Sequence, residues 1–106
     1  MTNPRKFGPI PIEDFAVLSD DSAEVARIWV TDRKGSTVVI DAGVLADPEM
    51  FGVLMADTIS HAAIAHARAL DIPESVAAAL IWRGLDGARP EPDADALRAI
   101  NTRSLN

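Results

Sequence analysis

Asp57 and His61 are the two side chains whose types and spacing could support chemistry. Residues four apart on a helix are neighbours on one side, so this carboxylate and this imidazole can form a hydrogen bond. A carboxylate that orients an imidazole ring is one half of many acid–base sites. A small enzyme or ligand-binding domain built on this chain would use Asp57 and His61 together with Arg27.

A simpler interpretation of the same pair is structural. An exposed pair at this spacing stabilises a helix by about 0.2–0.5 kcal/mol. Alternatively, the pair forms a hydrogen bond to the N-terminal arm and holds the arm in place. We favour this interpretation because no nucleophile or second acid follows at a fixed spacing. His66 lies five residues after His61, about 140° round a helix, so the two rings cannot share a metal by themselves. We therefore expect no catalytic residue, no cofactor and no metal site.

The element that carries this pair is a helix predicted over residues 47–70. Asp47 suits the N-cap and Pro48 the first helical position, where its missing N–H costs nothing. Arg68 lies in the last turn, and the sequence Asp71-Ile72-Pro73 ends the helix. Small residues on this helix and the next permit close helix packing, within the chain or across a two-fold axis: Ala62, Ala63, Ala67 and Ala77 to Ala79.

Residues 24–42 predict a β-hairpin, because two runs rich in β-branched residues flank Asp32-Arg33-Lys34-Gly35. Gly35 fits the left-handed position of a type I turn followed by a bulge. Alternation places one apolar set on the face expected to pack on the long helix: Ile28, Val30, Val38 and Ile40. The other face is mixed and holds Arg27, Trp29 and Val39.

The remaining segments are shorter. Residues 1–14 are rich in proline and predict an extended arm, and the apolar run 15–18 favours a third strand. Residues 73–84 predict a second helix, with Glu74 and Asp71 as a capping box and Gly84 as its C-terminal stop. Asp93 is expected to cap a short helix in residues 93–106.

Composition excludes several classes of protein. The formal charge is −6, which disfavours nucleic acid and anionic membrane surfaces as partners. The chain has no cysteine, so disulfides and thiol chemistry are impossible. No apolar run is long enough to span a bilayer, and the first residues lack the apolar segment of a signal peptide. These features favour a cytoplasmic protein.

A set of residues within 24–70 resembles a small bacterial family of domains of unknown function. The resemblance is carried by R-x-W-V from Arg27 to Val30, by the pair Asp47-Pro48, and by a helical pattern G-x-L-x-A-D-x-x-x-H. That pattern comprises Gly52, Leu54, Ala56, Asp57 and His61. Phe51 stands where the family pattern has tryptophan, an exchange of one aromatic residue for another. The resemblance implies that these residues form one module, and it implies no activity.

The sequence thus predicts one α+β domain over residues 1–106, with an arm (1–14), a core (15–92) and a C-terminal helix and tail (93–106). A hairpin, or a three-stranded antiparallel sheet, would be covered on one face by two or three helices. The open face carries Trp29 and Val39, and Trp82 points away from the apolar side of its helix. We expect these three residues to lie at the interface of a homodimer or of a complex with another protein. Alternatively, Phe7, Ile10 and Ile12 of the arm cover the sheet within one chain.

Overall fold

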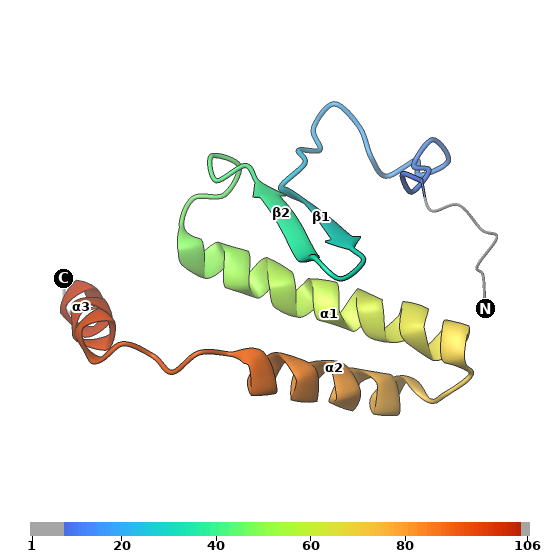
Figure 1. Ribbon diagram of the computed structural model, residues 1–106. Coiled ribbons are helices and arrows are strands. Elements are labelled where there is room, and N and C mark those ends of the chain that lie inside the picture. The colour runs from blue at the N-terminus through green and yellow to red at the C-terminus, as the bar shows by residue number, and fades with distance from the viewer. Residues whose placement is uncertain (1–7, 105–106) are drawn as a thin grey trace. The chain divides into compact units, whose positions relative to one another are not determined.

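The computed structural model describes residues 8–104 and has the predicted α+β composition. Two antiparallel strands, β1 (Ala26–Thr31) and β2 (Gly35–Ile40), precede three helices, α1 (Pro48–Leu70), α2 (Glu74–Ala88) and α3 (Ala94–Ser104) (Figure 1). The chain divides into two compact units, Met1–Pro48 with the hairpin and Glu49–Asn106 with the helices. The α+β prediction is therefore confirmed.

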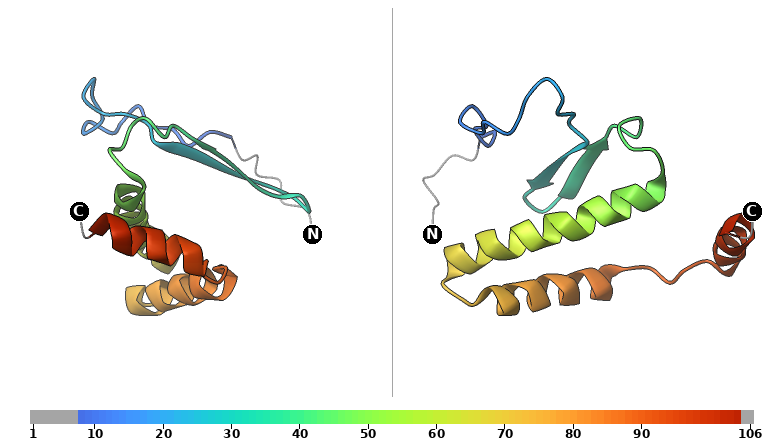
Figure 2. Two further views of the ribbon diagram at one scale, coloured as in Figure 1. Left: turned by 90° about the vertical axis from the view of Figure 1, so that its left-hand side faces the viewer. Right: turned by 180° about the vertical axis from the view of Figure 1, so that it is seen from behind.

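The register of the hairpin agrees with the predicted alternation. Ile28 pairs with Val38 and Ala26 with Ile40, whereas Trp29 pairs with Thr37 and Arg27 with Val39. Because directly paired residues point to the same side of a sheet, the mainly aliphatic set and the Trp29 set lie on opposite faces. Figure 2 shows the hairpin from its edge as a thin ribbon.

The predicted third strand is wrong. Residues 15–18 form a turn, in which the Leu18 N–H donates to the Phe15 carbonyl at 3.0 Å. In the preceding turn, the Phe15 N–H donates to the Ile12 carbonyl. In the part of the chain that the structure describes, the sheet therefore has two strands. Four apolar residues are too few to show which period applies, and here the nearby turn residues prevail.

The hairpin turn differs in type from the prediction. Gly35 has the expected left-handed backbone, with φ of 87°, but Arg33 also has positive φ, 64°. The turn closes through the Lys34 N–H, which donates to the Thr31 carbonyl at 2.9 Å. Arg33 is the third residue of this four-residue turn, and positive φ there belongs to type II rather than type I. A residue with a Cβ atom thus occupies a conformation that favours glycine.

Helix α1 matches its predicted bounds, and its end has a specific geometry. Asp71 adopts the left-handed conformation with φ of 55°, and the Ile72 N–H donates to the Ala67 carbonyl at 3.1 Å. This is the Schellman arrangement, which reverses the chain directly after the helix. Ile72 then packs against the residues buried between α1 and α2.

The buried core of the helical unit is made of alanine. Ala63, Ala67 and Ala77 are the buried hydrophobic residues, and Ile72, Ala78 and Ile81 pack against them. Small side chains let α1 and α2 lie close together, and both views show the two helices side by side (Figures 1 and 2). Of the predicted alanines, Ala63, Ala67, Ala77 and Ala78 therefore pack within the chain, whereas Ala79 is exposed. Packing of the hairpin's aliphatic face on α1 stays a prediction.

Helix α2 ends later than predicted and begins without the predicted capping box. Pro73 occupies the N-cap position and makes no side-chain capping bond. Gly84 continues the helix, which ends at Ala88, two residues before Pro90. Glycine is a stop only where the backbone turns left-handed, and Gly84 does not. Helix α3 follows its prediction, since the Asp95 N–H donates to the Asp93 carboxylate at 2.7 Å.

Gly52→Ala is expected to raise the free energy of unfolding of the helical unit by about 1 kcal/mol. Gly52 lies inside α1, and a Cβ atom built there meets no other atom within 4 Å. The gain should be measured by urea denaturation, with Gly84→Ala as the matched variant in α2, where a Cβ atom also meets open space. A loss of stability at Gly52 alone would show that another segment or molecule packs closely there.

Candidate functional site

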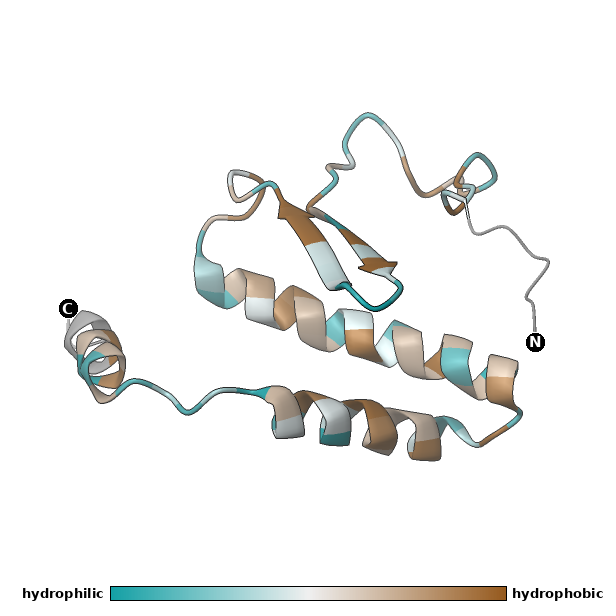
Figure 3. Cartoon of the chain, in the orientation of Figure 1, coloured by the Kyte–Doolittle hydropathy of each residue, from teal (hydrophilic) through white to brown (hydrophobic). Residues whose placement is uncertain are grey.

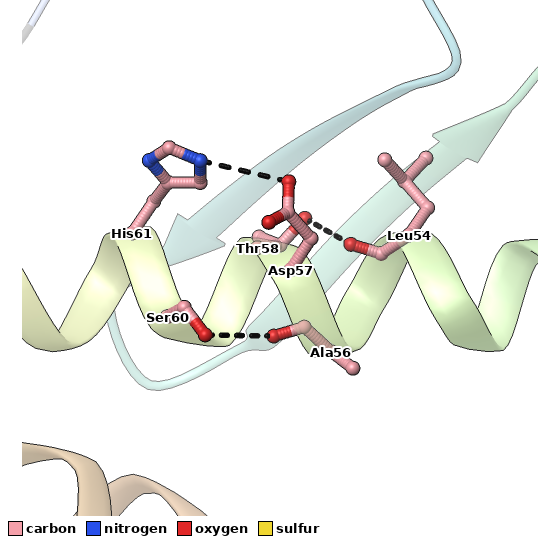
Figure 4. Close-up of polar contacts among 6 residues, drawn as sticks. All are labelled: Leu54, Ala56, Asp57, Thr58, Ser60 and His61. Carbon is pink, nitrogen blue, oxygen red and sulfur yellow. Dashed lines mark hydrogen bonds and ion pairs between the residues drawn. The ribbon is translucent and has the colours of Figure 1, made fainter.

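The predicted pair on α1 forms, but it lies in water. His61 Nε2 is 3.5 Å from Asp57 Oδ2, and the two side chains are 76% and 69% exposed. Figure 4 shows both pointing out from one side of α1, with Thr58 and Ser60 beside them. Thr58 donates to the Leu54 carbonyl at 2.8 Å and Ser60 to the Ala56 carbonyl at 3.5 Å. These hydroxyls therefore bond to their own helix rather than to the histidine.

Arg27, the third candidate, pairs with a different carboxylate. Its guanidinium lies 2.8 Å from the Glu24 carboxylate, three residues earlier, and both side chains are mostly exposed. The hydrogen bond from Arg27 holds the pKa of the Glu24 carboxyl below its usual value, and the same bond raises the pKa of Arg27. Arg27 belongs to the hairpin unit, whereas Asp57 and His61 belong to the helical unit.

Clusters of possible metal ligands were sought on the described residues. Among the described residues, no group of three or more His, Asp or Glu side chains could hold an ion. The position of His66 on the apolar side of the helix predicts a semi-buried side chain. The structure shows that His66 is exposed.

The helices of the described residues include none long and apolar enough to cross a bilayer.

The three residues predicted to lie at an interface are exposed. Trp29, Val39 and Trp82 are 46%, 58% and 42% accessible to solvent. The hairpin shows hydrophobic residues along both strands in Figure 3. On its other face four aliphatic side chains are exposed too: Ile28, Val30, Val38 and Ile40. Ile10 and Ile12 of the arm are themselves exposed, and Phe7 lies outside the described residues.

Comparison with known families gives one decisive match. A family model described as "Domain of unknown function (DUF5076)" matches residues 9–93. The chain belongs to this family. The resemblance noted in residues 24–70 is thereby confirmed and extended, since the match includes α2 and the segment before the hairpin.

A solved structure is also similar to this DUF5076 chain. It is described as "a putative pyruvate dehydrogenase from the photosynthetic bacterium Rhodopseudomonas palustrus CGA009". The two chains are 31% identical, with a TM-score of 0.55, over 89% of this chain and 93% of the other. None of the curated proteins matches.

His61→Ala is expected to lower the free energy of unfolding of the DUF5076 chain by at most about 0.5 kcal/mol. Both partners of the pair are mostly exposed, so water screens their interaction and replaces their hydrogen bond. Thermal denaturation at neutral pH measures the change, with His66→Ala as an exposed control on the same helix. A loss well above that of the control would indicate that His61 has a further partner.

Proposed function

We propose that this DUF5076 protein is not an enzyme and that it acts by self-association, as a homodimer, or by binding another protein. The observation that carries the proposal is the smallness of the buried core. In the part of the chain that the structure describes, the buried hydrophobic residues are three alanines, although 48% of the chain is hydrophobic. Among the residues whose burial is described, twenty large hydrophobic side chains are exposed, including both tryptophans.

The hairpin has an energetic need for such a partner. A two-stranded hairpin is at best marginally stable in water, and a third strand or a packed hydrophobic face is required. Here both long edges lack a partner strand in the described residues. Dimerisation at or near Trp29 and Val39 would supply this missing contact.

Sedimentation equilibrium of the purified chain at micromolar concentration is expected to give twice the mass of 11.3 kDa. The Trp82→Phe variant isolates Trp29, whose emission should shift to the red when dilution separates the copies. A monomer at all concentrations, with Trp29 emission already shifted to the blue, would contradict self-association. It would show that the chain's own N-terminal arm covers the sheet.

The alternative is a small enzyme that uses Asp57 and His61 with Arg27. The relative's description makes oxidation of pyruvate the reaction to assay. We expect no turnover, because the pair lies in water, where fixed charges stabilise a transition state weakly. Turnover that His61→Ala removes, with the fold intact, would establish the enzyme instead.

A further inference from the structure

The open edge of strand β2 presents backbone N–H and C=O groups that can pair with another strand. The Asp41 N–H donates to the Val25 carbonyl at 2.9 Å, so residues 25 and 41 form a hydrogen-bonded pair. Pairs alternate along an antiparallel ladder, which makes 27 with 39 and 29 with 37 hydrogen-bonded pairs as well. Three residues of β2 therefore direct their N–H and C=O groups away from β1: Ser36, Val38 and Ile40.

We propose that two copies of the chain join through this edge, β2 against β2, in antiparallel register centred on Val38. This inference rests on the proposed homodimer and specifies its interface. Val38 of one copy then faces Val38 of the other, and Ser36 faces Ile40. This register places all six outward backbone groups of each copy in hydrogen bonds, and the two-fold axis passes between the two Val38 residues.

Composition favours β2 over β1 as the paired edge. The chain carries a net charge of −6, so self-association is opposed unless the contact avoids like charges. Strand β2, GSTVVI, has no charged residue and four β-branched ones. It also lacks the Lys, Pro or bulge that commonly protects an open edge from pairing.

The charges that flank the two strands also favour β2 over β1 as the paired edge. In the β2 register, Gly35 faces Asp41 of the other copy, so the cationic turn residue Lys34 comes beside that carboxylate. The equivalent register of β1, centred on Ile28, would place Glu24 opposite Asp32 of the other copy. Like charges directly opposite one another destabilise a sheet, so the β1 edge is the poorer surface.

The product is a four-stranded sheet of order β1-β2-β2-β1, which meets the minimum for an independently stable sheet. Ile28, Val30, Val38 and Ile40 of both copies would form one continuous aliphatic face. On the other face, Val39 would lie beside Thr37 of the second copy in a close, non-hydrogen-bonded pair. Trp29 would lie one strand away from the two-fold axis.

Single cysteines test the register directly, because the chain has none of its own. Hydrogen-bonded antiparallel pairs have Cα atoms about 5.5 Å apart, within the range that a disulfide spans. Val38→Cys should therefore form a covalent dimer under mild oxidation. Ile28→Cys, at the equivalent outward position of β1, is the matched control and should stay uncrosslinked.

Proline variants test the backbone bonds. Val38→Pro removes an N–H that points away from β1, so the hairpin keeps its own ladder. It should raise the dissociation constant of the dimer by about 10- to 100-fold. Ile28→Pro makes the same change on the β1 edge and should leave the constant unaltered. Circular dichroism of both variants shows whether the fold persists.

The outcomes separate this interface from the dimer itself. Crosslinking at residue 38 and not at residue 28 supports the β2 edge. Crosslinking at residue 28 alone, or at neither position in a chain that sediments as a dimer, overturns it and leaves self-association standing. A chain that sediments as a monomer overturns both the β2 pairing and the homodimer.

Discussion

Ala77→Asp is expected to abolish the packing of α2 on α1, with a loss of more than about 3 kcal/mol in the free energy of unfolding. Ala77 is 2% exposed and lies in the alanine cluster with Ala63 and Ala67. The carboxylate would be larger than the space available, and its charge would have no partner there. Loss of the cooperative urea transition of the helical unit measures the effect.

Ala79→Asp is the matched control for this change. Ala79 lies two residues along the same helix and is exposed. The two substitutions share the helix, the new side chain and the charge, and they differ in burial. The control should lose about 0.5 kcal/mol or less, as is usual for surface substitutions. Equal losses in the two variants would mean that the alanine cluster does not hold the helices together.

Gly35→Val is expected to destabilise the hairpin by about 1–3 kcal/mol. Gly35 has φ of 87°, which a β-branched residue adopts only with strain. Amide hydrogen exchange in β1 and β2 measures the loss, because it reports the hairpin separately from the helices.

Arg33→Gly should act in the opposite direction on the same hairpin. Arg33 has φ of 64°, so glycine relieves a backbone conformation that costs a residue with a Cβ atom about 1 kcal/mol. Exchange in β1 and β2 should slow in this variant. Faster exchange would indicate that the Arg33 side chain makes a contact that outweighs its backbone strain.

The long helix and the hairpin could be predicted because several local signals agree in each. Helix α1 combines Asp47-Pro48 at its start with a proline-containing stop, and β1 and β2 are alternating, β-branched runs on either side of a turn. The end of α2 could not be predicted from Gly84. Whether glycine ends a helix depends on its φ, and the residues that follow continue the helical hydrogen bonds.

The contact between Asp57 and His61 could be predicted from the sequence, but the exposure of the pair could not. The spacing of Asp57 and His61 fixes their contact on α1, whereas their exposure depends on what packs over that side. The outward groups of β2 were missed for a similar reason. Which backbone groups face outward depends on the hydrogen-bond phase of the ladder, and side-chain alternation alone does not reveal it.

The single Asp–Pro peptide bond of the chain, between Asp47 and Pro48, lies one residue before the junction of the two units. Bonds of this kind hydrolyse selectively in dilute warm acid. The side-chain carboxyl of the aspartate attacks the backbone carbonyl carbon of the same residue, and the proline nitrogen is a good leaving group. The chain can therefore be divided chemically into a hairpin fragment and a helical fragment without any change of sequence. Calorimetry on a mixture of the two fragments then measures whether the units bind each other without the covalent link.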